Sequence, residues 1–280
     1  MLYSQSCTVA KQLASSLAPA PLPSLTHFTL ADYNNFYEPS DDTFLLVDAL
    51  AYDIPLTLSR RGSLAPPSSL RALEIGSGSG VNIVTVGSLL LSHRTAEVAA
   101  GRPPPSLLCF ATDVNPHALS ATKSTVAAAG YSRAGAGATA ERRGDLPPVP
   151  PPEALTFQVE ACDLLGSGSE PWWADGGVDF LVFNPPYVPT PDEEVAGDGI
   201  EASWAGGERG RRVLDRAAGG MARVLREGGV AYVIAVDDNR PMEIIDAFKR
   251  EYNLEGKVLL RRQAKNEFLS VLRFQKPMAA

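Results

Sequence analysis

Residues 72–80 constrain the fold of this chain most, because an apolar stretch passes there directly into a glycine-rich turn. The segment reads Ala-Leu-Glu-Ile-Gly-Ser-Gly-Ser-Gly. Ile83, Val86 and Leu90 follow at the spacing of one helix face. A strand, a tight turn and a helix in this order form the first half of a βαβ unit. Strands and helices continue to alternate to residue 236, so we expect an α/β fold with a mostly parallel sheet.

The glycine turn favours a ligand that comes close to the backbone, because glycine has no side chain to keep it away. A dinucleotide-binding turn would need a glycine where this chain has Val81. Glu74, near the end of the preceding strand, would repel a pyrophosphate and attract a cation. The turn therefore suits S-adenosylmethionine, which carries a sulfonium and an ammonium group, better than a phosphate-rich cofactor.

Polar residues also follow the next three predicted strands. Asp113 follows the predicted strand 107–112, Asp163 follows strand 155–160, and Asn184 follows strand 178–183. Asp113 can accept hydrogen bonds from both hydroxyls of a ribose, or it can serve only as a charge at a helix entry. Asp163 can hold an adenine amino group. Because ligands of open α/β sheets bind outside the carboxyl ends of the strands, Glu74 and these three residues should meet at one crevice.

Asn184, Pro185, Pro186 and Tyr187, called the NPPY tetrad below, offer hydrogen-bond acceptors and few donors. Proline lacks an N–H group, so an incoming group meets backbone carbonyls and the Asn184 side-chain oxygen. Such a site selects a planar NH₂ group, and accepting both of its hydrogens returns electron density to the nitrogen. Tyr187 could lie flat against that group. The alternative is a turn that ends a strand, since Asn and Pro are frequent turn residues.

The glycine turn, Asp113 and the NPPY tetrad together resemble the HemK-type glutamine methyltransferases, which are class I S-adenosylmethionine-dependent enzymes. Residues 37–44, Tyr-Glu-Pro-Ser-Asp-Asp-Thr-Phe, resemble the N-terminal signature of the eukaryotic and archaeal branch. The resemblance covers residues 37–274. The tetrad is shared with adenine and cytosine amino-methyltransferases, whereas segment 37–44 is more specific. We find no separate helical bundle before Tyr37, which argues against the bacterial branch.

The resemblance implies a Rossmann-like fold with a mostly parallel seven-stranded sheet, helices on both faces and an antiparallel edge strand. It implies S-adenosylmethionine as cofactor, no metal in this chain, and N5-methylation of the glutamine in the Gly-Gly-Gln motif of class-1 translation termination (release) factors. Asn184, Pro185 and Tyr187 would be catalytic, and the substrate would contact these three together with Pro186 and Val188. The implied cofactor contacts are Thr43, Glu74, Gly76, Gly78, Asp113, Asp163, Leu164 and Asn184.

The resemblance also implies a small zinc-binding activator subunit that several methyltransferases share, so that the enzyme is a heterodimer. In the class I strand order, strand 155–160 lies at a sheet edge. Unpaired backbone groups and exposed apolar side chains there would invite a strand from the partner. The proline-rich run at 147–152 could instead cover this edge. We expect a cytoplasmic location, with the nucleus as a second one.

Composition narrows the functional classes. The net charge is −7 and no long basic run occurs, which disfavours a nucleic-acid substrate because Lys and Arg supply most of the affinity for its phosphates. Cys7, Cys109 and Cys162 are the three cysteines, and their spacing indicates neither a disulfide framework nor a zinc site. No stretch reaches the roughly 20 apolar residues of a membrane span.

Three rival functions stay open. An adenine DNA methyltransferase would use the same tetrad, but it should carry a basic groove and base-flipping aromatic residues. A histone lysine methyltransferase would first have to remove a proton from the ammonium group, and no nearby base is evident. The third alternative is a protein that binds a nucleoside without catalysis.

The expected organisation is a flexible extension at residues 1–31 followed by a single methyltransferase domain at 32–280. Loop insertions are expected at 59–69, 92–105 and 132–152, which are rich in Gly, Pro, Ala or Ser. The expected elements outside the βαβ units are a helix at 42–52, a helix from 214 that Gly228 and Gly229 stop, a helix that begins at Asn239, and two antiparallel strands near 257–262 and 268–274.

The segment after the tetrad carries charges of both signs. The acids are Asp192, Glu193, Glu194, Asp198 and Glu201, and the basic residues that follow are Arg209, Arg211, Arg212 and Arg216. The acidic part is either a solvated loop or a lip that draws a basic peptide toward the pocket. The arginines either balance those acids or clamp the backbone of a partner.

Overall fold

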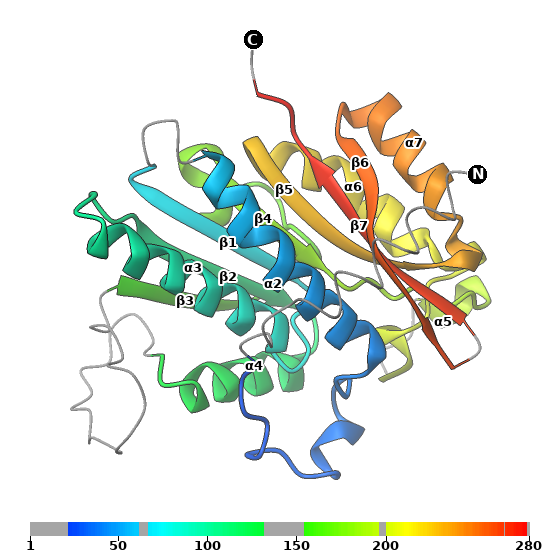
Figure 1. Ribbon diagram of the computed structural model, residues 1–280. Helices are drawn as coiled ribbons and strands as arrows, with labels where there is room; N and C mark the ends of the chain where they lie inside the picture. Colours follow the sequence, from blue (N-terminus) through cyan, green and yellow to red (C-terminus); the bar gives the residue numbers. More distant parts are fainter. Residues whose placement is uncertain (1–21, 62–66, 132–153, 196–199, 266, 279–280) are drawn as a thin grey trace.

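The computed structural model describes residues 22–61, 67–131, 154–195, 200–265 and 267–278. Its centre is a seven-stranded sheet in the order β3-β2-β1-β4-β5-β7-β6 (Figure 1). The strands are β1 (Ser69–Ile75), β2 (Ser106–Asp113), β3 (Leu155–Ala161), β4 (Val178–Phe183), β5 (Leu225–Val236), β6 (Glu255–Ala264) and β7 (Glu267–Gln275). Neighbours among β1 to β5 pair in parallel, whereas β7 is antiparallel to both β5 and β6. The mostly parallel seven-stranded sheet and its antiparallel pair are confirmed, with β7 one position in from the edge.

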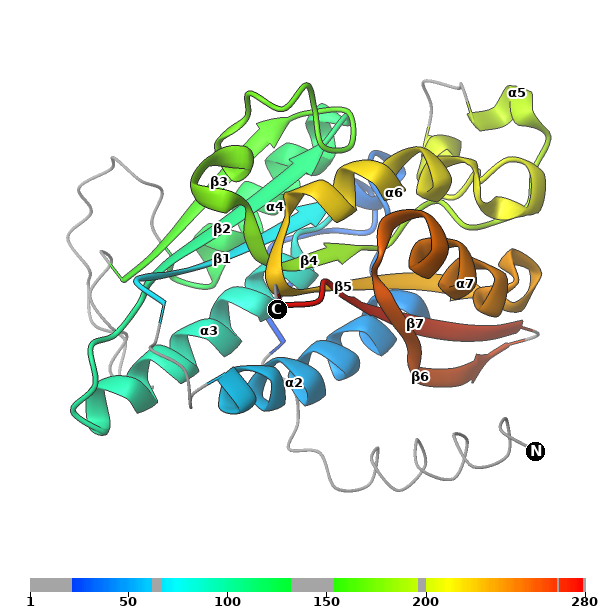
Figure 2. The same ribbon diagram turned by 90° about the horizontal axis from the view of Figure 1, so that it is seen from above.

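Helices cover both faces of the sheet, as expected. They are α2 (Asp41–Arg61), α3 (Val81–Ala99), α4 (Pro116–Ala128), the short α5 (Asp192–Val195), α6 (Arg212–Val224) and α7 (Pro241–Tyr252). Short 3-10 turns are η1 (Asp32–Asn34), η3 (Pro171–Gly176), η4 (Ile200–Ser203), η5 (Glu208–Gly210) and η6 (Asp237–Asn239). Figure 2 shows α2 and α3 on one side of the sheet and α6 and α7 on the other.

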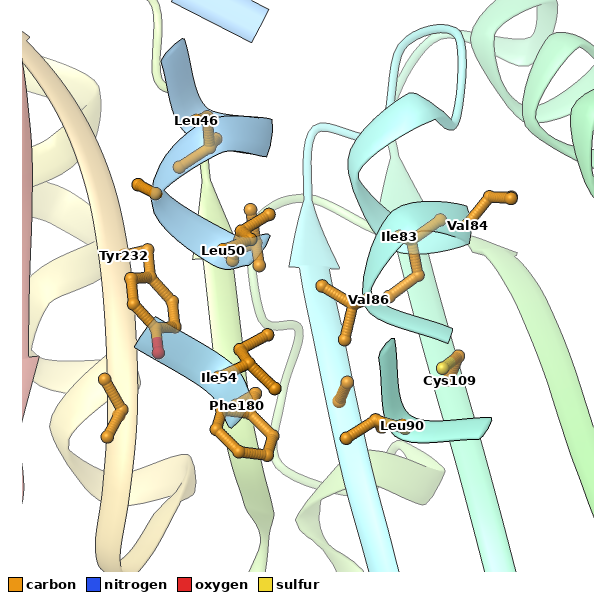
Figure 3. Packing of buried hydrophobic residues seen from close by; sticks show 14 of the residues in the cluster. Leu46, Leu50, Ile54, Ile83, Val84, Val86, Leu90, Cys109, Phe180 and Tyr232 are labelled. Atoms are coloured by element: carbon orange, nitrogen blue, oxygen red, sulfur yellow. The ribbon is translucent and has the colours of Figure 1, made fainter. Parts of the chain in front are cut away.

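The strands are apolar on both faces, so alternate residues fill two separate cores. Along β5, Tyr232 and Ile234 belong to the core under α2 and α3, whereas Val233 and Ala235 belong to the core under α6 and α7. Figure 3 shows the first core, where Leu50 of α2 lies with residues of α3, β4 and β5. Continuous apolar strands of this kind are typical of a parallel sheet that is buried on both sides.

Two helices are longer than expected. α2 continues past residue 52 to Arg61 with Pro55 inside it, because Ile54 and Leu58 are buried against the sheet. α3 continues to Ala99, so residues 92–99 are helical and only the rest of the expected 92–105 insertion is loop. Of the insertion at 59–69, the first three residues lie in α2 and Ser69 begins β1, while 62–66 lies outside the described residues. The insertion at 132–152 also lies outside them.

The expected stop of α6 at Gly228 and Gly229 was wrong. The helix ends at Val224, β5 begins at Leu225, and the two glycines lie inside the strand. The pairing of β4 with β5 shifts register near them. A Cβ on Gly229 would lie 2.7 Å from the Arg226 carbonyl oxygen, so this irregular part of the strand has no room for a side chain.

The part of the expected extension that the structure describes packs on the domain. Phe28 lies edge-on to Phe36, and both contact a small core with Ala118 and Ala121 of α4. The His27 ring lies 3.3 Å from the Thr125 hydroxyl of α4, so the contact with this helix includes residue 27. No helix in the described part of the chain is long and apolar enough to cross a membrane.

Candidate active site

The carboxyl ends of β1 and β4 lie side by side where the strand order reverses. Ile75 pairs with Phe183, so the residues that follow them, Gly76 and Asn184, leave the sheet as neighbours. The register also brings the ends of β2 and β3 to this edge, because Asp113 pairs with Ala161. Open α/β sheets bind ligands at such a switch point. The convergence expected from the sequence is therefore present in the fold.

The glycine turn leaves open space beside two of its glycines. Gly76 and Gly78 have φ angles of +65° and +50°, and a Cβ built on either meets no atom within 4 Å. Gly80 differs, because its Cβ would lie 2.9 Å from the backbone of Thr122 in α4. The first two glycines are thus free to face a ligand, whereas the third is required for packing. The Gly78 N–H donates to Asp113 Oδ2 at 3.0 Å, which ties the turn to the end of β2.

Glu74 holds the first turn of α3. Its two carboxyl oxygens accept hydrogen bonds from Asn82 Nδ2 at 2.9 Å and from the Ile83 N–H at 3.0 Å, and the residue is 1% exposed. Burial, with a smaller contribution from the nearby Asp113 charge, raises the pKa of Glu74 to about 8, although its two hydrogen bonds oppose this shift. Such a carboxyl gains its charge most readily beside a cation. Its direct contact with a cofactor stays a prediction.

Asp113 organises the end of β2 through both of its oxygens. Besides the bond from Gly78, Oδ1 accepts a hydrogen bond from the Asn115 N–H at 2.9 Å, and burial raises the pKa of Asp113. The next residue, Val114, is 67% exposed although it is apolar. Val114 therefore presents an apolar surface beside the Asp113 carboxylate. Sequence reasoning missed Val114 because the pattern of residues does not reveal its exposure.

Asp163 and Leu164 follow β3 at the same edge but have different surroundings. Asp163 makes an ion pair with Arg216 of α6 at 2.7 Å, and both side chains are more than half exposed. Leu164 has a φ of +55°, and its carbonyl accepts a hydrogen bond from the Thr112 hydroxyl at 3.1 Å. Exposed ion pairs stabilise proteins little, so Asp163 can exchange Arg216 for another partner at small cost. Its expected bond to an adenine amine stays a prediction.

Asp42, at the start of α2, is the centre of the hydrogen-bond network around the tetrad. Its Oδ2 accepts from Tyr37 Oη at 2.9 Å, Asn184 Nδ2 at 3.0 Å and Tyr187 Oη at 3.1 Å. Its Oδ1 accepts from the backbone N–H of Thr43 at 2.6 Å and from the Thr43 hydroxyl at 3.2 Å. Thr43 is thus bonded to Asp42 and is only 4% exposed. Its expected contact with the cofactor stays a prediction.

Sequence reasoning gave no role to Asp42, although it lies in the 37–44 segment that carries the family resemblance. The sequence did point to this segment, because residues 37–44 are more specific to the glutamine methyltransferases than the tetrad is. The structure supplies the reason, because this segment places one carboxylate against two residues of the tetrad.

The side-chain oxygen of Asn184 is buried and has no hydrogen-bond partner among the described residues. Its amide nitrogen is bound to Asp42, so the amide is held with the oxygen free to accept. A buried polar atom without a partner costs about 1–3 kcal/mol. A fold that keeps such an acceptor at a switch point indicates a site for an external donor. In this state the oxygen is enclosed, so a donor can reach it only when neighbouring side chains move.

The two tyrosines of the network are uncharged at physiological pH. Burial and the Asp42 charge raise the pKa of both Tyr37 and Tyr187 far above the usual value for a phenol. Both hydroxyls donate to Asp42, so neither serves as a base. Among the other tetrad residues, Pro185 is buried and Pro186 is partly buried, while Val188 is 36% exposed. Val188 is thus the member of the expected substrate surface that is most open to solvent.

Three of the arginines after the tetrad pair with acids outside the segment 192–201. Within that segment Glu193, Glu194 and Glu201 are exposed, whereas Asp198 lies outside the described residues. The ion pairs of three of the arginines are Arg209 with Glu243, Arg211 with Asp215 and Glu243, and Arg216 with Asp163. These arginines therefore balance acids from other parts of the fold.

The described residues contain no group of three or more His, Cys, Asp or Glu side chains that could hold a metal ion. Cys109 is buried, and burial raises its pKa well above that of a free thiol. The chemistry-bearing groups at the crevice are therefore carboxylates, one amide and two phenols.

Comparisons with known proteins identify several relatives, although no family model matches the chain. Methyltransferase HEMK2 of Mus musculus is 36% identical over 264 residues, which are 94% of this chain and 100% of that protein. Methyltransferase HEMK2 of Homo sapiens is 35% identical over 250 residues, covering 89% and 94%. The eRF1 methyltransferase catalytic subunit mtq2 of Schizosaccharomyces pombe is 28% identical over 253 residues, covering 90% and 94%.

Among solved structures, the E. cuniculi Mtq2-Trm112 complex, described as responsible for methylation of the eRF1 translation termination factor, matches with a TM-score of 0.48 and 23% identity. That match covers 86% of this chain and 99% of the other. The two mammalian relatives align with 94% and 89% of this chain. This chain therefore belongs to the HEMK2 family of methyltransferases.

Proposed function

We propose that this protein transfers a methyl group from S-adenosylmethionine to the side-chain amide nitrogen of the glutamine in the Gly-Gly-Gln motif of the class-1 translation termination factor. The observation that carries the proposal is the unpartnered Asn184 oxygen, which is held in place by Asp42. A glutamine amide has the two N–H donors that this oxygen and a neighbouring carbonyl can accept. The fission yeast relative, which is named an eRF1 methyltransferase catalytic subunit, supports the choice of substrate.

In the proposed reaction, Asn184 Oδ1 and the Pro185 carbonyl each accept one hydrogen of the substrate NH₂ group. These two bonds orient the nitrogen lone pair and raise its electron density, while the Tyr187 ring confines the amide plane. Positioning supplies most of the rate in such a site. No residue has to form a covalent intermediate, because the nucleophile is the substrate nitrogen itself. With the cofactor bound, the new bond from nitrogen to the methyl carbon would form as the bond from that carbon to sulfur breaks, and the nitrogen would then release one proton to solvent water.

The residues at the crevice fit S-adenosylmethionine. The open space at Gly76 and Gly78 admits a ligand close to the backbone, Asp113 suits ribose hydroxyls, and Val114 suits the base. Glu74, buried next to Asp113, favours a bound cation over a phosphate. When bound, the cofactor supplies a methyl group on a positively charged sulfur. Thr43, Asp163, Leu164 and Asn184 stay proposed contacts.

The same network disfavours a lysine substrate. An ammonium group must lose a proton before it can attack a methyl group. Both oxygens of Asp42 already accept hydrogen bonds from inside the protein, and both phenols donate to it. A neutral amide needs no such base before attack, so the glutamine proposal agrees better with the site.

Mass spectrometry with isotope-labelled cofactor tests the proposal. The protein is incubated separately with a termination-factor domain, an adenine-containing oligonucleotide and a histone peptide. We expect a mass increase of one labelled methyl group on the Gly-Gly-Gln glutamine only. A termination-factor domain in which that glutamine is replaced by Glu is the control and should stay unlabelled. Label on adenine or on lysine alone would overturn the proposal, and no label on any of the three with the activator subunit present would favour the nucleoside-binding alternative.

A partner subunit at β3 is also proposed, in a heterodimer with a small zinc-binding activator. Among the described residues β3 pairs with β2 alone, which supports the proposal because the outer edge of β3 then leaves backbone groups for a partner strand. The expectation of exposed apolar side chains was wrong, because Leu155 and Phe157 are buried under α3 near Gly87. Backbone pairing therefore has to supply the affinity at this edge. The name "catalytic subunit" of the fission yeast relative supports a multi-subunit enzyme.

Hydrogen exchange with and without the activator subunit tests this partner. We expect slower amide exchange along β3 when the subunit is added. The opposite edge strand, β6, is a matched control in the same molecule and should exchange at the same rate in both samples. Protection confined to β6, or a soluble and fully active monomer, would contradict the proposed interface. We also propose a cytoplasmic location, where the proposed substrate acts in translation, with the nucleus as a second one.

A further inference from the structure

Asn239 was expected to begin a helix, and the structure gives it a different place. α7 begins at Pro241, and Arg240 precedes it with a φ of +54° and no side-chain cap. Asn239 instead ends the turn η6 after β5, is 2% exposed, and turns its side chain inward. Its Oδ1 accepts a hydrogen bond from the Val236 N–H at 2.8 Å. The amide is thereby anchored to the end of a central strand.

The Asn239 amide nitrogen donates to the backbone of the tetrad. Nδ2 lies 2.8 Å from the Tyr187 carbonyl oxygen and 2.8 Å from the Arg209 carbonyl oxygen. One buried side chain therefore links the end of β5, the tetrad and the turn η5. This use of both amide hydrogens and the carbonyl oxygen satisfies the amide almost completely, which is typical of a buried Asn in a fixed geometry.

The tetrad needs such support because two of its residues have no N–H group. Pro185 and Pro186 cannot be held by bonds that they donate, so the segment must be fixed through its carbonyls and by packing. Glycines make that packing possible. A Cβ on Gly210 would lie 1.9 Å from the Tyr187 carbonyl oxygen, and one on Gly206 would lie 2.7 Å from the Pro186 carbonyl oxygen.

We propose that Asn239 is a positioning residue for the methyl-transfer reaction. It fixes the Tyr187 carbonyl, and through the rigid proline pair it fixes where the Pro185 carbonyl and the Tyr187 ring meet the substrate. It touches neither substrate nor cofactor. The proposal rests on the function proposed above, because it assumes that the tetrad carbonyls hold the reacting amide. It predicts that loss of the Asn239 amide hydrogens slows turnover without weakening ligand binding.

The test is the nearly isosteric variant Asn239→Asp. Its carboxylate can still accept from the Val236 N–H, but it has no amide hydrogen for the Tyr187 and Arg209 carbonyls. We expect kcat to fall about 100-fold, the cost typical of a displacement on the order of 1 Å in an active site. KM for the termination-factor domain and Kd for the cofactor should stay within about twofold of wild type.

Thr57→Val is the matched control for loss of stability. Thr57 is a buried polar residue in α2 that exchanges hydrogen bonds with Asp53 and Arg273, remote from the tetrad in the network. In Thr57→Val the midpoint of thermal unfolding should fall, as it should in Asn239→Asp. The kcat of Thr57→Val at about 20 °C should nevertheless stay near that of wild type. If Thr57→Val loses the same turnover at an equal loss of midpoint, or if Asn239→Asp changes KM rather than kcat, the positioning role is wrong.

Hydrogen exchange gives a readout that does not depend on the substrate. The Val188 N–H bonds to the Trp204 carbonyl and the Gly206 N–H to the Val188 carbonyl, directly beside the tetrad. In Asn239→Asp both amides should exchange faster, while amides of β1 keep the wild-type rate. Unchanged exchange at both would contradict the proposal even if glutamine were the wrong substrate. Wild-type protein that leaves glutamine unlabelled but shows the faster exchange in the variant would overturn only the proposed function.

Discussion

Asp42 Oδ2 lies 3.0 Å from Asn184 Nδ2, although the two residues are 142 positions apart in the chain. This bond joins the first turn of α2 to the end of β4. An asparagine amide has one end that donates and one that accepts, and either could face a ligand. Asp42 binds the donating end, and the accepting end has no partner among the described residues. The contact therefore decides which kind of group the site can recognise.

Asp42→Asn should remove this control while keeping the size of the side chain. Asp42 receives five hydrogen bonds on its two oxygens, and an asparagine offers one oxygen and one donor in their place. Whichever way the new amide turns, its NH₂ group faces another donor. We expect kcat for the termination-factor domain to fall about 100-fold, with cofactor Kd within about tenfold. Initial rates and calorimetry measure the two quantities.

Asp41→Asn is the control for that variant. Asp41 occupies the preceding position of the same helical turn and is exposed, so the change alters charge without touching the network. Its kcat should equal that of wild type within about twofold, as is usual for a surface substitution away from special contacts. Equal losses in the two variants would mean that the charge of α2, and not the bond to Asn184, matters.

Asn184→Ala should abolish turnover, because it removes the acceptor that holds the substrate amide. Asn184→Asp should also fail, since it would place a second carboxylate about 3 Å from Asp42, and two such groups cannot both ionise at that distance. Cofactor affinity of Asn184→Ala should stay within about tenfold of wild type, roughly 1.4 kcal/mol. Calorimetry that showed complete loss of cofactor binding would assign Asn184 to the cofactor site instead.

The fold was largely predictable from the sequence, because apolar strands alternate with amphipathic helices. All of the strands expected from residue 72 to residue 274 are present, and the strand ends meet as predicted. Boundaries were less predictable. Pro55 does not end α2, because Ile54 and Leu58 on the same helix are buried against the sheet, and Gly228 lies in a strand whose register shift no local pattern reveals.

The site was predictable only where it depends on residues close in sequence. Asn184 and Asp113 stand at strand ends that a local pattern marks. Asp42 and Asn239 act through contacts between distant segments, and their residue types are as common at helix starts as in active sites. The sequence therefore marked Asn184 and Asp113 as candidate site residues, whereas the contacts of Asp42 and Asn239 with the tetrad were not foreseen.

Gly78→Ala and Gly80→Ala should separate ligand space from packing. A methyl group on Gly78 enters open space at the crevice, so we expect weaker cofactor binding with a modest loss of stability from the positive φ, about 1–2 kcal/mol. On Gly80 it would meet the Thr122 backbone, so the thermal midpoint should fall further. Calorimetry and thermal unfolding measure both effects.

Gly101→Ala is the matched control for the backbone strain of Gly78→Ala. Gly101 has a φ of +69° and open space at its Cβ. It lies between α3 and the start of β2, at the amino ends of the parallel strands, whereas the crevice lies at their carboxyl ends. Its stability loss should match that of Gly78→Ala while its cofactor Kd stays at the wild-type value. Equal weakening of cofactor binding in both would show that strain, and not occupied space, is responsible.

Glu74 should make the stability of the unliganded protein depend on pH between about 4.5 and 8. Burial raises the pKa of Glu74 in the folded protein to about 8 from the usual 4.5 of a glutamate, so the folded state holds a proton that the unfolded state has released in this range. The stabilisation is complete below the unfolded pKa and is lost as pH rises through the folded one. Glu74→Gln cannot titrate, so the difference in thermal midpoint between wild type and variant should shrink from pH 6 to pH 8.5. A constant difference across this range would show that Glu74 is already charged in the folded protein.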